Sequence, residues 1–165
     1  MAKWYHNEFK GRGRITFKNS GNYYEANSTN PADEVARQRN FDFSIGWFGG
    51  PWTDGDYPQT LKDTLGDLLP ELTQEEKDLI KGSCDFYAID PYSSFIAYET
   101  KGGVEACASN RSAPAFPECA GSVSLAPNGF PVGPAGDPTM DWLYSAPTGI
   151  RRFLKHITTV LFPIL

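Results

Sequence analysis

Apolar residues recur at helical spacing in several segments of the chain, and capping residues mark where these segments begin. Asn30 can cap a helix, Pro31 occupies the first helical position, and an acidic residue follows in the first turn. Thr73 and Glu76 have the spacing of a capping box. Pro147 opens a segment with one apolar stripe, formed by Ile150, Phe153, Leu154, Ile157 and Leu161. We predict helices over residues 31–48, 59–68, 74–81 and from 147 onward.

Two short runs have the composition of β-strands. Arg14–Phe17 is β-prone and precedes the turn-forming residues 19–22, after which we expect a loop to Asn30. Asp85–Ile89 is a continuous apolar run, typical of a strand buried on both faces. Because helices separate the two runs, the order is that of a βαβ unit, whose strands pair in parallel. The predicted fold class is therefore α/β, in a single domain of residues 1–165.

The stretch from Phe41 to Pro58 combines aromatic residues with helix breakers. Gly49 and Gly50 permit backbone angles that other residues resist, and Pro51 interrupts a helix. We therefore expect the helix that starts after Asn30 to end near residue 48. Four aromatic side chains in this stretch are large enough to favour burial, namely Phe43, Trp47, Phe48 and Trp52.

Residues 99–141 have a different character from the rest of the chain. They are dense in Gly, Pro, Ser and Ala and show no sustained periodicity. We predict a long loop without regular structure here. Loops of this length are uncommon in compact domains and are usually functional or mobile.

The overall composition indicates a globular protein and limits its partners. Hydrophobic residues make up 40% of the chain and aromatic residues 14%. The net charge of −5 gives no electrostatic reason to expect a nucleic-acid partner. The sequence contains no apolar run of membrane-spanning length, so we predict no membrane partner.

Cysteine usage and glycosylation patterns bear on the compartment. Three cysteines are too few for a disulfide framework, but Cys107 and Cys119 could bridge in an oxidising environment. Asn27 and Asn110 each begin an acceptor pattern for N-glycosylation. These features suggest a secreted parent protein, although the first residues lack the apolar stretch of a secretory signal. The localisation is therefore left open.

The histidines do not form a metal-binding pattern. His6 and His156 are far apart in the sequence and have no accompanying Cys or acid at ligand spacing. We predict no metal site and expect His156 to be solvated on the outer side of the last helix.

Several motifs, in order, resemble those of a known family. The residues are Phe43–Phe48 (FSIGWF), Gly55–Pro58 (GDYP), Leu69–Pro70, the capped acidic helix from Thr73, and Gly82–Tyr87 (GSCDFY). In this order and spacing they resemble the second half of family 1 glycoside hydrolases, which include the retaining β-glucosidases. The resemblance implies a partial (β/α)₈ barrel, from about the fifth strand to the sixth helix, and the next strand would begin at Phe162–Leu165. A complete barrel of this type usually needs about 250 residues.

The resemblance also implies where the two catalytic acids would lie. A retaining glycosidase needs two carboxyl groups about 5–5.5 Å apart. In the family one belongs to an Asn-Glu-Pro motif and the other, the nucleophile, to a Glu-Asn-Gly motif. Neither tripeptide occurs in these 165 residues. The sequence therefore carries the surroundings of a glycosidase site without its two glutamates.

Four residues match or stand near site positions of the family. The family's sixth strand ends in Asn-x-Tyr, whose Tyr orients the nucleophile; Tyr92 matches it, whereas Asp90 stands where Asn is expected. A second carboxylate there could raise the pKa of the nucleophile. Trp142 resembles the tryptophan on which the leaving group stacks, and Asn19 lies near the sugar site by analogy.

The function implied by this resemblance is hydrolysis of β-glycosidic bonds with retention, acting on β-glucosides or oligosaccharides without a cofactor. We expect the isolated chain to be inactive, since proton transfer and nucleophilic attack both need the missing acids. Two alternatives remain at this point. One is a non-catalytic carbohydrate-binding or interaction remnant of the same fold, and the other is a truncated product with no independent role.

Overall fold

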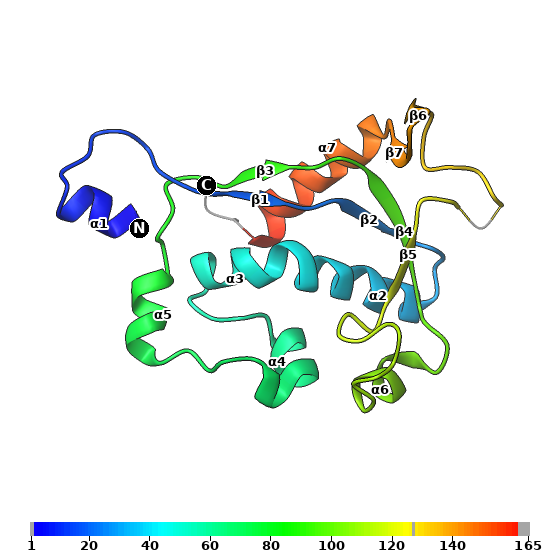
Figure 1. Ribbon diagram of the computed structural model, residues 1–165, viewed down its shortest axis with the longest axis horizontal. Helices are drawn as coiled ribbons and strands as arrows, with labels where there is room; N and C mark the ends of the chain where they lie inside the picture. The colour runs from blue at the N-terminus through cyan, green and yellow to red at the C-terminus, as the bar shows by residue number, and fades with distance from the viewer. Residues whose placement is uncertain (1, 127, 162–165) are drawn as a thin grey trace.

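The computed structural model describes residues 2–126 and 128–161, and two stretches of chain that run side by side form its centre (Figure 1). The first stretch contains β1 (Lys18–Ser20) and β2 (Tyr23–Ala26), and the second contains β3 (Ala88–Asp90) and β4 (Ser94–Tyr98). β1 pairs with β3 in parallel, as predicted for the two β-prone runs, and β2 pairs with β4 in parallel as well. β5 (Gly121–Val123) adds an antiparallel partner to β4. The fold is thus α/β, and its described strands form part of a barrel wall that does not close.

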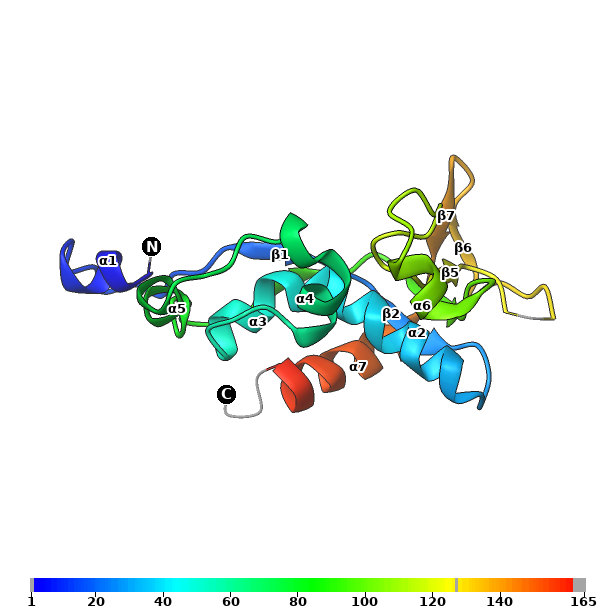
Figure 2. The same ribbon diagram turned by 90° about the horizontal axis from the view of Figure 1, so that it is seen from below.

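Helices make up most of the connection between the two stretches. In chain order the elements are α2 (Pro31–Phe41), a π-helical segment (Asp42–Gly46), α3 (Trp47–Thr53), α4 (Gln59–Leu65), a 3₁₀ turn (Gly66–Leu68) and α5 (Gln74–Ile80). The predicted caps at Asn30 and Thr73 are both formed. α7 (Pro147–His156), extended by a π-helical turn (Ile157–Leu161), lies beside α2 and α3 (Figure 2). The remaining elements are α1 (Ala2–Asn7), α6 (Gly103–Ala108), β6 (Ala135–Asp137) and β7 (Met140–Tyr144).

The main core lies where the α2–α3 helix and α7 meet the strands. Phe41 from α2 and Phe153 from α7 are 1% and 0% exposed, and their rings stack with centroids 6.0 Å apart. Tyr23 of β2 lies 6.0 Å from the Phe41 ring, while Ile45 and Ile157 complete the contact between the helices. Burial of these large apolar surfaces is what holds the two helices against the strands.

A second cluster attaches α4 to the same long helix. Phe43 packs with leucines at positions 61, 65 and 69. Gly50 permits this approach, because a Cβ there would lie 3.0 Å from the Pro58 ring. Burial alone would raise the pKa of Asp56, but hydrogen bonds from Lys62 and Lys77, each 2.7 Å away, lower it to about 2. The Gly-Asp-Tyr-Pro turn therefore joins α3, α4 and α5 through packing and charge.

The N-terminal helix α1 projects from the body of the molecule (Figure 1). Its His6 ring contacts the Asp85 carboxylate at 2.8 Å, which raises the pKa of His6. The same carboxylate accepts a hydrogen bond from the backbone N–H of Ile15 at 2.6 Å. Trp4 and Phe9 stack on each other and stay 58% and 64% exposed.

The predicted parallel pairing of the two strands is confirmed, but the predicted strand boundaries are wrong. Pairing begins at Lys18 rather than within Arg14–Phe17, and the second strand begins at Ala88 and is only partly buried. The predicted loop after residue 22 contains β2, and β4 was missed as well. Gly21 misled the prediction, because it permits close approach to a helix: a Cβ there would lie 2.4 Å from Ile45.

The expected helix end near residue 48 is also wrong. The helix continues to Thr53, and residues 49–52 are buried inside it. Pro51 lies inside α3, and burial of the Pro51 and Trp52 side chains outweighs the local preference of proline for a helix end. Phe48, which we expected to be buried, is 53% exposed.

Residues 99–141 contain more regular structure than predicted. α6, β5 and β6 lie within this segment, and β7 begins in it. A disulfide joins Cys107 of α6 to Cys119, with the Cα atoms 5.6 Å apart. Arg39 of α2 donates hydrogen bonds to the carbonyls of Glu118 (2.6 Å) and Pro117 (3.4 Å) and so attaches this segment to the core.

His156 is not solvated as expected but stacks on the Phe41 ring, with centroids 4.0 Å apart. Burial, followed by the nearby charge of Arg37, lowers its pKa to about 4. The side chain of Leu161 and residues 162–165, where we expected the next strand, lie outside the described residues. Within residues 2–126 and 128–161, no helix has the length and apolarity needed to cross a bilayer.

We predict that Phe153→Ala lowers the free energy of unfolding by about 3–5 kcal/mol, since it opens a cavity between α7 and α2. Phe48→Ala is the matched control, because an exposed phenylalanine contributes less than about 0.5 kcal/mol. Urea unfolding followed by circular dichroism gives both values. Equal losses in the two variants would contradict the core described above.

We also predict that His156 makes stability depend on pH. Its pKa is about 4 in the folded chain and near 6.5 when unfolded, so its contribution is complete above pH 6.5 and is lost as pH falls toward 4. Because solvent screens the partly buried ring, we expect about 1 kcal/mol between pH 7.5 and pH 4.5. His156→Gln should remove this part of the pH dependence in urea unfolding, and an unchanged profile would refute the assignment.

Candidate functional site

The candidate site lies at the carboxyl ends of β1 and β3. In a parallel pair these ends share one edge, so residues that follow the two strands come together. The register places Asn19 opposite Ile89 and Ser20 opposite Asp90. The chain then turns through Pro91 into Tyr92, next to the start of β4.

Asp90 has two polar partners at this edge. Lys18 Nζ lies 2.5 Å from its Oδ2 atom, and the Tyr92 hydroxyl donates a hydrogen bond to the same oxygen at 3.0 Å. The hydrogen bond from Lys18, followed by that from Tyr92, lowers the pKa of Asp90. The Asp90 Oδ1 atom is buried without a hydrogen-bond partner. Asp90 is therefore an ionised, charge-paired carboxylate.

Tyr92 is held by its backbone while its ring stays accessible. The Asn22 side chain accepts hydrogen bonds from the backbone N–H groups of Tyr92 (3.2 Å) and Ser93 (2.9 Å). The Tyr92 ring is 53% exposed and meets the Trp142 ring edge to face, with centroids 6.1 Å apart. Trp142 comes from β7 and is 46% exposed. The structure therefore brings Asp90, Tyr92 and Trp142 together.

Asn19 lies at the same edge but its side chain points into the protein. It is 5% exposed, and its Nδ2 donates a hydrogen bond to the Tyr87 hydroxyl at 3.1 Å. Burial raises the pKa of Tyr87. In this conformation Asn19 supports the wall behind the site.

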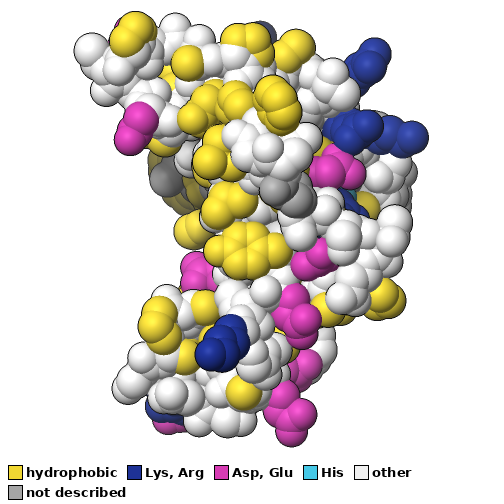
Figure 3. Space-filling model, turned by 90° about the vertical axis from the view of Figure 1, so that its right-hand side faces the viewer, with side chains coloured by type: hydrophobic (Ala, Val, Ile, Leu, Met, Phe, Trp, Pro, Cys, Tyr) yellow, Lys and Arg dark blue, Asp and Glu magenta, His cyan; other side chains and the backbone are white. Residues whose placement is uncertain are grey.

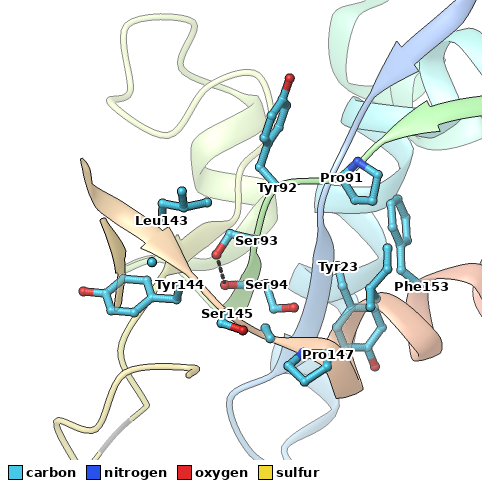
Figure 4. Close-up of a pocket in the computed structure, with 13 residues that line it drawn as sticks. Tyr23, Pro91, Tyr92, Ser93, Ser94, Leu143, Tyr144, Ser145, Pro147 and Phe153 are labelled. Atoms are coloured by element: carbon cyan, nitrogen blue, oxygen red, sulfur yellow. Dashed lines mark hydrogen bonds between the residues drawn. The ribbon is translucent and has the colours of Figure 1, made fainter. Parts of the chain in front are cut away.

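A largely apolar pocket of about 430 Å³ begins beside Tyr92 (Figure 4). Tyr23 and Phe153 line it from the core side, and Leu143 and Tyr144 of β7 line the opposite side. In Figure 4 the Tyr92 ring points away from the other lining residues. Figure 3 shows hydrophobic side chains gathered on the side of the molecule that carries β6 and β7. Such a surface can receive the apolar face of a sugar ring or of an aromatic leaving group.

The two predicted N-glycosylation sites lie outside the segments that form this edge. Asn27 is partly buried, and its side chain contacts Asp33 at 3.5 Å. Asn110 is exposed in the turn that follows α6. Among the described residues, no group of three or more His, Cys, Asp or Glu side chains is arranged to hold a metal ion.

Two residues of this site were missed in the sequence. The sequence pattern gave Lys18 no role and assigned Asn22 to a turn. Both act across the parallel pairing, on residues about 70 positions away. Hydrophobic patterning carries no signal for such contacts.

Comparison with known proteins shows which family this chain resembles. The model of glycosyl hydrolase family 1 matches residues 2–161. The chain is 34% identical to beta-glucosidase 42 of Arabidopsis thaliana, over 88% of this chain and 29% of that protein. It is 33% identical to raucaffricine-O-beta-D-glucosidase of Rauvolfia serpentina, over 92% of this chain and 28% of that protein. The chain thus spans less than a third of these relatives.

Solved structures give the same picture. The beta-glucosidase from Trichoderma harzianum superposes with a TM-score of 0.83 at 29% identity, over 97% of this chain and 33% of that one. The family 1 beta-glucosidase of Humicola insolens, solved with glucose, has a TM-score of 0.83 at 28% identity, over 97% and 32%. Since the family model covers nearly the whole sequence and the strand pairing is that of a partial barrel, the chain belongs to glycosyl hydrolase family 1.

Proposed function

We propose that this chain forms the part of a retaining β-glucosidase that orients the nucleophile and receives the leaving group. The observation that carries the proposal is the contact between Tyr92 and Trp142 at the carboxyl end of β3. In a barrel enzyme the active site lies at that end of the strands. The beta-glucosidases that the chain resembles support β-glucosides or oligosaccharides as the substrate class.

In this proposal the two aromatic residues have different roles. The Tyr92 hydroxyl donates a hydrogen bond to the nucleophile carboxylate, and Trp142 offers its exposed face to the leaving group. Asn19 holds the wall behind the sugar, and Asp90 accepts the Tyr92 hydrogen bond at 3.0 Å when no nucleophile is present. None of these residues replaces the two glutamates that a retaining mechanism uses.

A non-catalytic carbohydrate-binding role is the second candidate. It is favoured by the aromatic pair, which is present and accessible although the sequence lacks both glutamate motifs. Stacking on a sugar ring needs no acid, so binding could persist where hydrolysis does not. Measurements of hydrolysis and of sugar binding distinguish the two functions.

We predict that the 165-residue chain does not hydrolyse an aryl β-glucoside. Proton transfer to the leaving group contributes about 10²–10⁴-fold to such reactions, and the nucleophile is also missing. The measurement is release of the aryl alcohol, beside a version extended at both ends with the surrounding coding sequence. Activity of the extended version alone supports the enzyme assignment, and equal turnover by the short chain would overturn the prediction.

We predict that Trp142→Ala weakens binding of a non-hydrolysable aryl thioglucoside by up to about tenfold, since an aromatic contact contributes about 0.5–1.5 kcal/mol. Trp4→Ala is the matched control, because Trp4 is also well exposed but lies at the far end of the molecule, on α1. Calorimetric titration of the three proteins gives the affinities. Unchanged binding by Trp142→Ala, or equal weakening by both variants, would remove Trp142 from the sugar-binding surface.

A further inference from the structure

The Tyr92 hydroxyl has one proton, and in this structure that proton is directed at Asp90. A hydroxyl donates a single hydrogen bond. The proposed function requires Tyr92 to donate to a second carboxylate, so the two carboxylates would compete for the same donor. The Tyr92 hydroxyl can turn away from Asp90 only if another donor pairs with that carboxylate.

Lys18 is that donor. Its ammonium lies 2.5 Å from the Asp90 Oδ2 atom, which also accepts the Tyr92 hydrogen bond at 3.0 Å. Lys18 stands on β1 opposite Ala88, two residues before the position opposite Asp90, so its side chain reaches along the strand toward the carboxyl end. The parallel register therefore fixes this approach, and two donors meet at one carboxylate oxygen.

We propose that Lys18 is a positioning residue of this site: its ammonium pairs with Asp90 and so allows the Tyr92 hydroxyl to turn from Asp90 to a second acceptor beside Trp142. This inference rests on the proposed function for the identity of that second acceptor. The pairing itself does not depend on it.

The charges support this assignment. Asp90 brings a negative charge to a position where the family pattern has a neutral Asn, and Lys18 supplies the compensating positive charge. The hydrogen bond with Asp90 raises the pKa of Lys18, while the hydrogen bonds from Lys18 and then Tyr92 lower the pKa of Asp90. Lys18 from β1 and Tyr92 after β3 are the groups that act on this carboxylate. The negative charge of Asp90 would raise the pKa of a nearby nucleophile carboxylate, and the positive charge of Lys18 offsets this effect.

The pair is exposed enough that its effect should be moderate. The Lys18 side chain is 61% exposed and that of Asp90 24% exposed. Exposed ion pairs change equilibria by up to about fivefold. Removal of Lys18 should consequently alter the site without unfolding the protein.

The experiment is a double-mutant cycle on the full 165-residue chain, with Lys18→Met, Asp90→Asn and the double variant. Lys18→Arg tests rescue, because arginine keeps the charge. Lys62→Met is the matched control, since Lys62 pairs with Asp56 at 2.7 Å, well outside the site. The readouts are the carboxyl ¹³C titration of Asp90 and the indole N–H resonance of Trp142, followed by titration with an aryl thioglucoside.

We expect Lys18→Met to raise the pKa of Asp90 and shift the Trp142 resonance, Lys18→Arg to restore both, and Lys62→Met to change neither. In the Asp90→Asn background, Lys18→Met should have no further effect on Trp142. If Lys18→Met behaves like Lys62→Met, or acts equally with and without the Asp90→Asn change, the inference is wrong.

The thioglucoside titration separates this inference from the proposed function. A loss of up to about fivefold in affinity for Lys18→Met, absent when Asp90→Asn is also present, supports both. If no variant binds the thioglucoside while the NMR cycle behaves as expected, the proposed function fails and the coupling of Lys18 to Asp90 and Trp142 stands. If binding is normal but the NMR cycle shows no coupling, the proposed function stands and the role of Lys18 is wrong.

Discussion

The packing of Phe41 against its neighbours is the contact on which the rest of the structure depends. Its ring meets those of Tyr23 and Tyr24 on β2, Phe153 and His156 on α7, and the guanidinium of Arg37. One residue thus joins the long helix, the last helix and the first stretch of strands. Because each strand is only three to five residues long, the strand layer depends on this packing against the two helices.

The candidate site follows from that arrangement. The helices between the two stretches of strand make the pairing parallel, and parallel pairing brings the carboxyl ends of β1 and β3 to one edge. Lys18, Asp90 and Tyr92 meet there although the first is more than 70 residues from the others. β7 then adds Trp142 from a distant segment. The site is a product of topology, and no short motif contains it.

The sequence was informative where local chemistry determines the structure. The caps at Asn30 and Thr73 could be predicted because each depends on a few neighbouring residues, and the parallel pairing of β1 with β3 could be predicted from the order of the elements. The predicted stripe of α7 is correct for Phe153 and Ile157, whereas Leu154 is 50% exposed. Motif order was enough to identify the family. Sequence reasoning failed where packing overrides local preference. Gly21 and Pro51 have the local character of breakers, yet one permits close approach to Ile45 and the other lies within a helix. The contacts of Lys18 with Asp90 and of His156 with Phe41 link distant segments and could not be seen before the fold was known.

The central claim is that the edge formed by Tyr92 and Trp142 is a sugar-binding surface of a family 1 glycoside hydrolase. The most direct measurement is a two-dimensional NMR titration of the chain with an aryl thioglucoside, in which its four tryptophan indole resonances are followed. The account predicts that the Trp142 resonance shifts on binding, whereas those of Trp4, Trp47 and Trp52 stay close to their positions. Saturable shifts centred on another tryptophan, or no shift at any concentration, would contradict it.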